Sequence, residues 1–288
     1  EDERQQALSL KPGQMIYGGF NGTEIMRQQR NYATNPTIIS GDLSNSGVEQ
    51  SRSYNLFKLE SDDENIINRA TFVDGLILEQ AAQSAMVNKD ASPTVYNTIF
   101  RYNNGENGAA VRNEDGSSPL FYQALMHHNN ASVSGGAVWS DATSSATLIN
   151  ATVGLNQAPT TGGVHGAATV YNSIVYGNTN QQLPDAVDVR NSCVEGGFAG
   201  ASNTAFNPLW VDAEAANFRL SEFSSCIDMG NVTLMPEMPT YDLDFKGRLM
   251  ALRVDIGAYE AQTKGTVLVT ETSISDELSL YNDYILVR

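Results

Sequence analysis

Charged side chains at a recurring spacing would be the first sign of a polysaccharide-cleaving enzyme. A lyase needs a base and a cation beside a uronate carboxylate, and a hydrolase needs two carboxylates about 5–9.5 Å apart. Arg101 and Arg112 are the candidate cations, and Asp74, Asp185 and Asp188 are the candidate acids. None of these acids recurs at the same position of a neighbouring repeat, and a solvated outer face accounts for both arginines. The sequence therefore assigns no catalytic residue.

Histidines and one acidic turn are the candidate metal ligands. His127 and His128 are adjacent, so on a strand they should point to opposite faces and not share an ion with His165. Asp242 and Asp244 carry carboxylates that suit calcium, but a turn without an ion is the favoured interpretation. We therefore predict no metal and no cofactor.

One tryptophan and two cysteines complete the candidate residues. Trp139 follows a Gly-Gly-Ala-Val turn, and an exposed tryptophan can stack on a sugar ring, whereas a packed one would contact the neighbouring coil. It is the single ligand-binding candidate. Cys193 and Cys226 form one disulfide or remain two buried thiols, and the sequence leaves both alternatives open.

These residues lie in or beside a segment that occurs four times. The copies follow one another at intervals of about 22 to 27 residues, and in each copy the second residue is small and the fourth is apolar. The copies are residues 97–103, 123–129, 150–156 and 172–178. We expect their final residues at one corner of successive coils, where asparagine suits a left-handed turn and its amide can bond its neighbours. These final residues are Asn103, Asn129, Asn156 and Asn178.

The repeat predicts an all-β fold, a right-handed parallel β-helix. Each copy is too short for a helix and is bounded by turn residues. One coil cannot bury its apolar side chains alone, so the coils must stack into a solenoid. Leucine-rich, calcium-binding nonapeptide and helical repeats fit worse because their patterns are missing.

The pattern along the chain also predicts its organisation. We expect a β-helix with opening coils and a closing cap over residues 1–260, and the start of a C-terminal β element over residues 261–288. The unfinished strand pattern at Arg288 and the short lead before Leu10 suggest a fragment of a longer secreted protein. Repeated coils are expected over about residues 70–197, with short strands outside them at residues 15–17, 37–39, 208–212, 218–220, 266–270 and 278–287.

Composition narrows the partners. The chain has 288 residues and a formal net charge of −16. An acidic surface repels phosphate backbones, so nucleic acid is not an expected partner. No run of 18 apolar residues occurs, so we expect no membrane span within this chain.

Several motifs resemble those of one bacterial family. Residues 10–24 and 35–42 are similar to the opening coils of surface proteins with β-helix repeats that carry a choice-of-anchor Q domain, and four later segments are similar to that family's closing coils. These segments are residues 191–197, 207–212, 225–230 and 255–260. The Gly-Gly-Ala-Val repeats also resemble those of polymorphic outer-membrane proteins. The turn at residues 242–247 departs from the family's Asp-Leu-Asp-Gly pattern, which weakens a calcium loop there.

The resemblance implies an exported protein of the bacterial cell surface and supplies no catalytic residues. We expect a non-catalytic module for adhesion or for binding and displaying glycans, with glycans or a host or matrix surface as partners. One alternative is a polysaccharide lyase or glycoside hydrolase with a groove along the helix, an architecture that such enzymes share. The other is a structural spacer.

Overall fold

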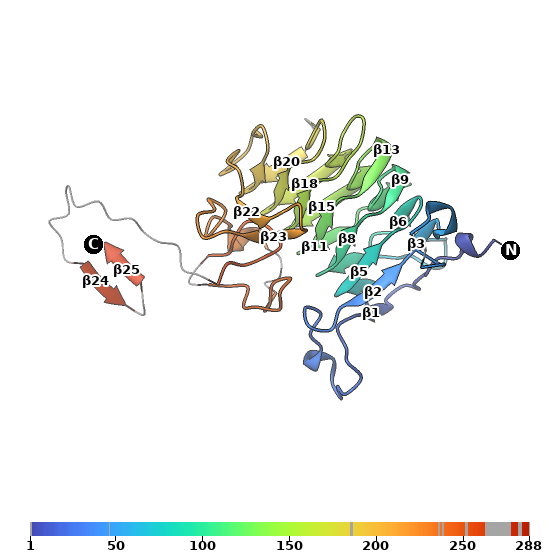
Figure 1. The fold of residues 1–288 in the computed structure, drawn as a ribbon, viewed down its shortest axis with the longest axis horizontal. Helices are drawn as coiled ribbons and strands as arrows, with labels where there is room; N and C mark the ends of the chain where they lie inside the picture. The colour runs from blue at the N-terminus through green and yellow to red at the C-terminus, as the bar shows by residue number, and fades with distance from the viewer. Residues whose placement is uncertain are drawn as a thin grey trace.

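The computed structural model describes residues 2–45, 47–184, 187–235, 237, 239–250 and 253–262, with the backbone of residues 278–281 and 284–287. It confirms the predicted fold class, a right-handed parallel β-helix (Figure 1). Three parallel sheets run along the stack, and within the described residues each coil adds one strand to two or three of them. Five coils carry all three strands.

The described strands of the stack form three parallel sheets. Sheet 1 contains β1 (Met15–Tyr17), β4 (Phe72–Asp74), β7 (Thr94–Tyr96), β11 (Leu120–Tyr122), β15 (Ser145–Ile149), β18 (Ala167–Tyr171) and β20 (Val187–Arg190). Sheet 2 contains β2 (Thr37–Ser40), β5 (Leu76–Glu79), β8 (Ile99–Arg101), β12 (Leu125–His127), β16 (Thr152–Gly154), β19 (Ile174–Tyr176) and β21 (Cys193–Val194). Sheet 3 contains β3 (Asn55–Glu60), β6 (Ser84–Lys89), β10 (Val111–Glu114), β14 (Val138–Ser140) and β17 (Val164–His165). A short pair, β9 (Asn104–Asn107) and β13 (Asn130–Ser134), lies between sheets 2 and 3 in chain order.

The register of the four repeats is as predicted. Their fourth residues are consecutive partners in sheet 2, and their second residues are also fully buried, so large and small side chains form separate interior rows. The large row is Phe100, Met126, Val153 and Val175. The stack also begins earlier than residue 70, because β1 and β2 pair in parallel with β4 and β5. Burial of these apolar rows is what makes the coils adhere.

The corners of the coils depend on left-handed backbone. After sheet 1 the turn residues Asn97 and Gln123 have φ of 46° and 53°, and after sheet 2 Tyr102 and His128 have φ of 54° and 52°. Our expectation that the final asparagine of each repeat is itself left-handed is wrong. The preceding residue takes that conformation, and the asparagine side chain is buried inside the corner.

The region after the last coil has two parts. Phe198 packs against the core at the end of the stack. The described residues between 207 and 262 then run back along its side, beginning with the antiparallel pair β22 (Trp210–Asp212) and β23 (Asn217–Leu220) (Figure 1). Corner side chains hold this segment, since Nδ2 of Asn150 donates to the carbonyl of Asp255 at 3.2 Å and Nδ2 of Asn172 to that of Asn231 at 3.0 Å.

The remaining elements are short. Four 3-10 turns occur in the described part of the chain, at Glu3–Gln5, Arg27–Gln29, Glu49–Ser51 and Val232–Leu234. The expected C-terminal strands are present as an antiparallel pair, β24 (Leu278–Tyr281) and β25 (Tyr284–Val287). The strand predicted at residues 266–270 lies outside the described residues.

Candidate ligand-binding groove

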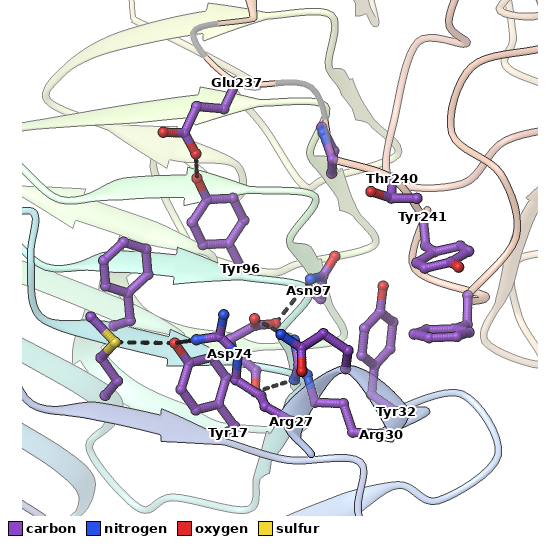
Figure 2. A pocket seen from close by; sticks show the side chains of 15 residues that line it. Tyr17, Arg27, Arg30, Tyr32, Asp74, Tyr96, Asn97, Glu237, Thr240 and Tyr241 are labelled. Carbon is purple, nitrogen blue, oxygen red and sulfur yellow. Dashed lines mark hydrogen bonds and ion pairs between the residues drawn. The ribbon is translucent and has the colours of Figure 1, made fainter.

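A groove of about 460 Å³ lies on the outer face of sheet 1, over its first strands (Figure 2). One wall is the loop between β1 and β2, and the other is a stretch of the returning C-terminal segment. The two walls come from opposite ends of the sequence. The groove is lined by Met15, Tyr17, Arg27, Gln28, Arg30, Tyr32, Phe72, Asp74, Tyr96, Asn97, Glu237, Pro239, Thr240, Tyr241 and Phe245.

Aromatic rings form the floor. Tyr96 and Tyr122 are register partners whose outward side chains stack, with ring centroids 5.3 Å apart. Phe72 on the preceding strand stacks on Tyr96 at 5.7 Å with an angle of 7° between the rings. Phe72 and Tyr96 are half-buried, and Tyr122 is covered completely. The parallel sheet therefore turns outward aromatic residues of successive coils into a continuous apolar strip.

An ion pair marks the edge of this strip. Asp74 ends β4 and accepts a hydrogen bond from the guanidinium of Arg30, and Asn97 Nδ2 donates to its other oxygen at 2.9 Å. Gly75 follows with φ of 76°, and a Cβ there would lie 2.8 Å from Nη1 of Arg30. Glycine at this corner therefore lets the arginine approach the sheet.

A chain of amides joins this ion pair to the opposite wall. Nε2 of Gln123 donates to Oδ1 of Asn97 at 2.7 Å and to the backbone carbonyl of Tyr241 at 2.8 Å. Asn97 and Gln123 are the first residues of their repeats, at the left-handed corner beside sheet 1. The repeated corner thus positions both the acidic group and the C-terminal wall.

Further contacts fix that wall. The hydroxyl of Tyr32 donates to the carbonyl of Asp242 at 2.7 Å, and its ring meets Phe245 edge-on at 5.2 Å. Phe245 in turn stacks on Tyr241 at 4.2 Å. Tyr241 is 42% exposed and lines the groove, so it is accessible to a ligand at the rim.

The electrostatics favour binding over proton transfer. Burial raises the pKa of the Asp74 carboxyl, and the Arg30 guanidinium opposes that rise, so the two groups form a balanced pair. Burial, with Glu237 nearby, raises the pKa of Tyr96 to about 12. Tyr96 therefore stays a neutral phenol. Both oxygens of Asp74 are already engaged, by Arg30 and by Asn97.

Trp139 lies elsewhere. It is on β14 in sheet 3, half-buried, and its ring is parallel to that of His165 with centroids 6.5 Å apart. Arg112 is its register partner on one side and His165 on the other. Its role as a ligand-binding residue is a prediction that concerns a different face from the groove.

The expected separation of the two adjacent histidines is wrong. The Nδ1 atoms of His127 and His128 lie 2.8 Å apart, because the left-handed backbone at His128 ends the strand alternation. Burial lowers the pKa of His127 to about 3. His165 is in another sheet, and the described part of the chain holds no group of three or more His, Cys, Asp or Glu side chains suited to a metal ion.

Three of the charged candidates other than Asp74 form ion pairs away from the groove, and Asp185 lies outside the described residues. Arg101 bonds Glu79 in sheet 2 at 2.6 Å and Arg112 bonds Glu114 in sheet 3 at 2.8 Å. Asp188 pairs with Arg190 at 3.0 Å. None of these residues lines the groove.

The acidic turn is occupied by protein donors. Oxygens of Asp242 accept hydrogen bonds from the backbone N–H groups of Asp244, Lys246 and Glu260, at 2.8 to 3.0 Å. The Asp244 carboxylate pairs with Arg219 at 2.5 Å. These contacts give both carboxylates a structural role in the returning segment.

Cys193 and Cys226 come together. Both are buried in one cluster with Ile174 and Ile256, and both are present as thiols. The neighbouring Cys193 thiol and burial raise the pKa of Cys226 far above its ordinary value. The structure thus brings the pair into contact, and its oxidation state in the native protein stays a prediction.

Of the residues that line the groove, only Asp74 is among the candidates that the sequence provides. A signal did exist. An aromatic residue directly precedes the first corner residue in three repeats, as Tyr96, Tyr122 and Tyr171. In a parallel stack these positions must form one outward column.

Comparison with known proteins gives no match: no family model, no curated protein and no solved structure is significantly similar to the chain. Among the residues described, no helix is long and apolar enough to cross a membrane.

Proposed function

We propose that this protein is a glycan-binding module of the bacterial cell surface and that the groove on sheet 1 is its binding site. The observation that carries the proposal is the strip of stacked rings in the groove, with Phe72 and Tyr96 half-exposed. Flat aromatic faces suit the apolar faces of sugar rings, and polar groups at the rim can bond sugar hydroxyls.

The rim supplies donors and acceptors of the kind that sugars need. Thr240 and Tyr241 present hydroxyls, and Gln28 presents an exposed amide. The only buried carboxylate of the groove within the described residues, Asp74, is held by Arg30 and Asn97 and is not free to donate a proton. This favours binding without cleavage.

Export and surface display rest on the resemblance of the opening and closing segments to proteins with a choice-of-anchor Q domain. A solenoid that grows by stacking coils also suits display, because its length can increase without a larger core.

The test is binding to a glycan array, followed by calorimetric titration of the best ligand. Tyr96→Ala should weaken binding about tenfold or more, since stacking of one aromatic ring contributes roughly 0.5–1.5 kcal/mol beyond its buried area. Tyr171→Ala is the matched control, because Tyr171 is an outward tyrosine of the same sheet outside the groove. Equal loss in both variants, with both folded, would contradict the proposal.

A further inference from the structure

One guanidinium in the groove forms no ion pair with the described residues. Arg30 is balanced by Asp74, but Arg27 has no carboxylate within ion-pair distance among the described residues. Arg27 is exposed at the rim on the side of β1.

Arg27 is also held in place. Its Nη1 donates to the hydroxyl of Tyr17 at 2.6 Å, and its guanidinium lies 4.8 Å from the centre of the Tyr17 ring. Just before it, Oε1 of Gln29 accepts hydrogen bonds from the backbone N–H groups of Ile25 and Met26, at 2.8 and 3.1 Å. The loop thus orders the arginine before any ligand arrives, which reduces the entropic cost of binding.

We propose that the groove selects an acidic saccharide, with a sugar carboxylate bound by Arg27 and the sugar rings on Phe72 and Tyr96. This inference rests on the glycan-binding function proposed above. The other N–H donors of Arg27 make no hydrogen bond to the described residues, and a planar guanidinium can bind a carboxylate through two parallel hydrogen bonds.

The opposite wall sets a second requirement. The Glu237 side chain reaches toward the strip from that wall, where the Tyr96 hydroxyl donates to it at 3.5 Å (Figure 2). Glu237 is exposed and has no basic partner within ion-pair distance in the described chain. Its carboxylate would accept hydrogen bonds from sugar hydroxyls and would repel a second carboxylate on the glycan. The groove therefore fits a glycan in which acidic and neutral sugars alternate better than one with a carboxylate on every residue.

The experiment is calorimetric titration of the whole chain with three tetrasaccharides. The first alternates a hexuronate with a neutral N-acetylhexosamine, the second is its carboxyl-reduced form, and the third carries sulfates in place of carboxylates. We expect the first to bind and the second to bind at least about tenfold more weakly, as for loss of a charge-assisted hydrogen bond. Arg27→Gln should abolish that difference, and Arg27→Lys should restore part of it.

Arg112→Gln is the control, because it removes the same charge from sheet 3, outside the groove. It should leave the preference for the carboxylated ligand intact. Equal binding of the first two ligands to the wild type would overturn the inference and leave glycan binding standing. Preference for the sulfated ligand would also overturn it. Binding of none of the three, together with an empty array, would reject the proposed function itself.

Discussion

The side chain of Asn129 donates a hydrogen bond of 2.9 Å to Oδ1 of Asn156, and both amides are completely buried. The same nitrogen donates to the carbonyl of Phe100 at 3.0 Å, while Oδ1 of Asn129 accepts from the backbone and side chain of Asn103. The pattern continues to Asn178. Each amide thus satisfies backbone groups of the coil before it, so the ladder ties coil to coil as well as closing the corner.

Asn129→Ala should destabilise the protein by roughly 3 kcal/mol, because it removes four buried side-chain hydrogen bonds and leaves the backbone N–H of Asn103 without its partner. The measurement is the free energy of unfolding in urea. Asn130→Ala is the matched control, since the neighbouring side chain is exposed. A similar, small change in both variants would show that the ladder adds little to stability.

How far the sequence predicts this structure depends on whether a residue repeats. Phe100 and Met126 recur at one position of the repeat, so their burial and register follow from stacking alone. Arg30 and Asp242 do not recur. Their places depend on loops that meet across the stack, as in the hydrogen bond from Tyr32 to the carbonyl of Asp242. No local pattern encodes that contact, so the groove could not be assembled from sequence.

The low pKa of His127 should make the folded protein less stable in acid. Burial lowers its pKa from 6.5 to about 3 in the folded chain. Between these values the unfolded chain binds more protons, so stability is present above pH 6.5 and is lost as the pH falls toward 3. The contribution is on the order of 3–5 kcal/mol. His127→Gln should show a shallower decline in urea titrations from pH 6.5 to 3.5, and a decline as steep as in the wild type would contradict the prediction.

The raised pKa of Glu260 should make the folded protein less stable as the pH rises. Its carboxyl is buried beside Arg248, and burial raises its pKa from 4.5 to about 8. Between these values the folded chain binds more protons, so this contribution is complete below pH 4.5 and declines up to pH 8, by about 1.4 kcal/mol per pH unit at most. Glu260→Gln should flatten the decline between pH 6 and 8. An unchanged slope would mean that Glu260 is ionised when folded; exposed Glu222→Gln is the control.

The cysteine pair links stability to the proposed export. If the protein reaches an oxidising compartment, we expect Cys193 and Cys226 to form a disulfide, because their thiols share one buried cluster. Closing a loop of about 30 residues would add roughly 3–4 kcal/mol in the chain-entropy model. Thiol titration of unreduced, denatured protein from such a compartment should find no free thiol. Two titratable thiols there would identify a buried reduced pair.

The last prediction is that the protein binds glycans without cleaving them. A lyase would need a base beside the sugar carbon next to the carboxylate that Arg27 binds. Asp74 is held by Arg30 and Asn97, and Tyr96, with its pKa near 12, stays protonated at neutral pH. Neither group can accept a proton readily.

A hydrolase would need a second carboxyl group to act with Glu237. Among the described residues of the groove the only other carboxyl group belongs to Asp74, which Arg30 and Asn97 hold. We therefore expect no turnover of polyuronates, of alternating uronate glycans or of neutral polysaccharides at protein concentrations that saturate binding. The assays are ultraviolet absorbance for unsaturated uronate and reducing-end release for hydrolysis. An increase in absorbance that is lost in Arg27→Gln but persists in Arg112→Gln would instead identify the groove as a lyase site. In that case Arg27 would neutralise the sugar carboxylate during proton abstraction.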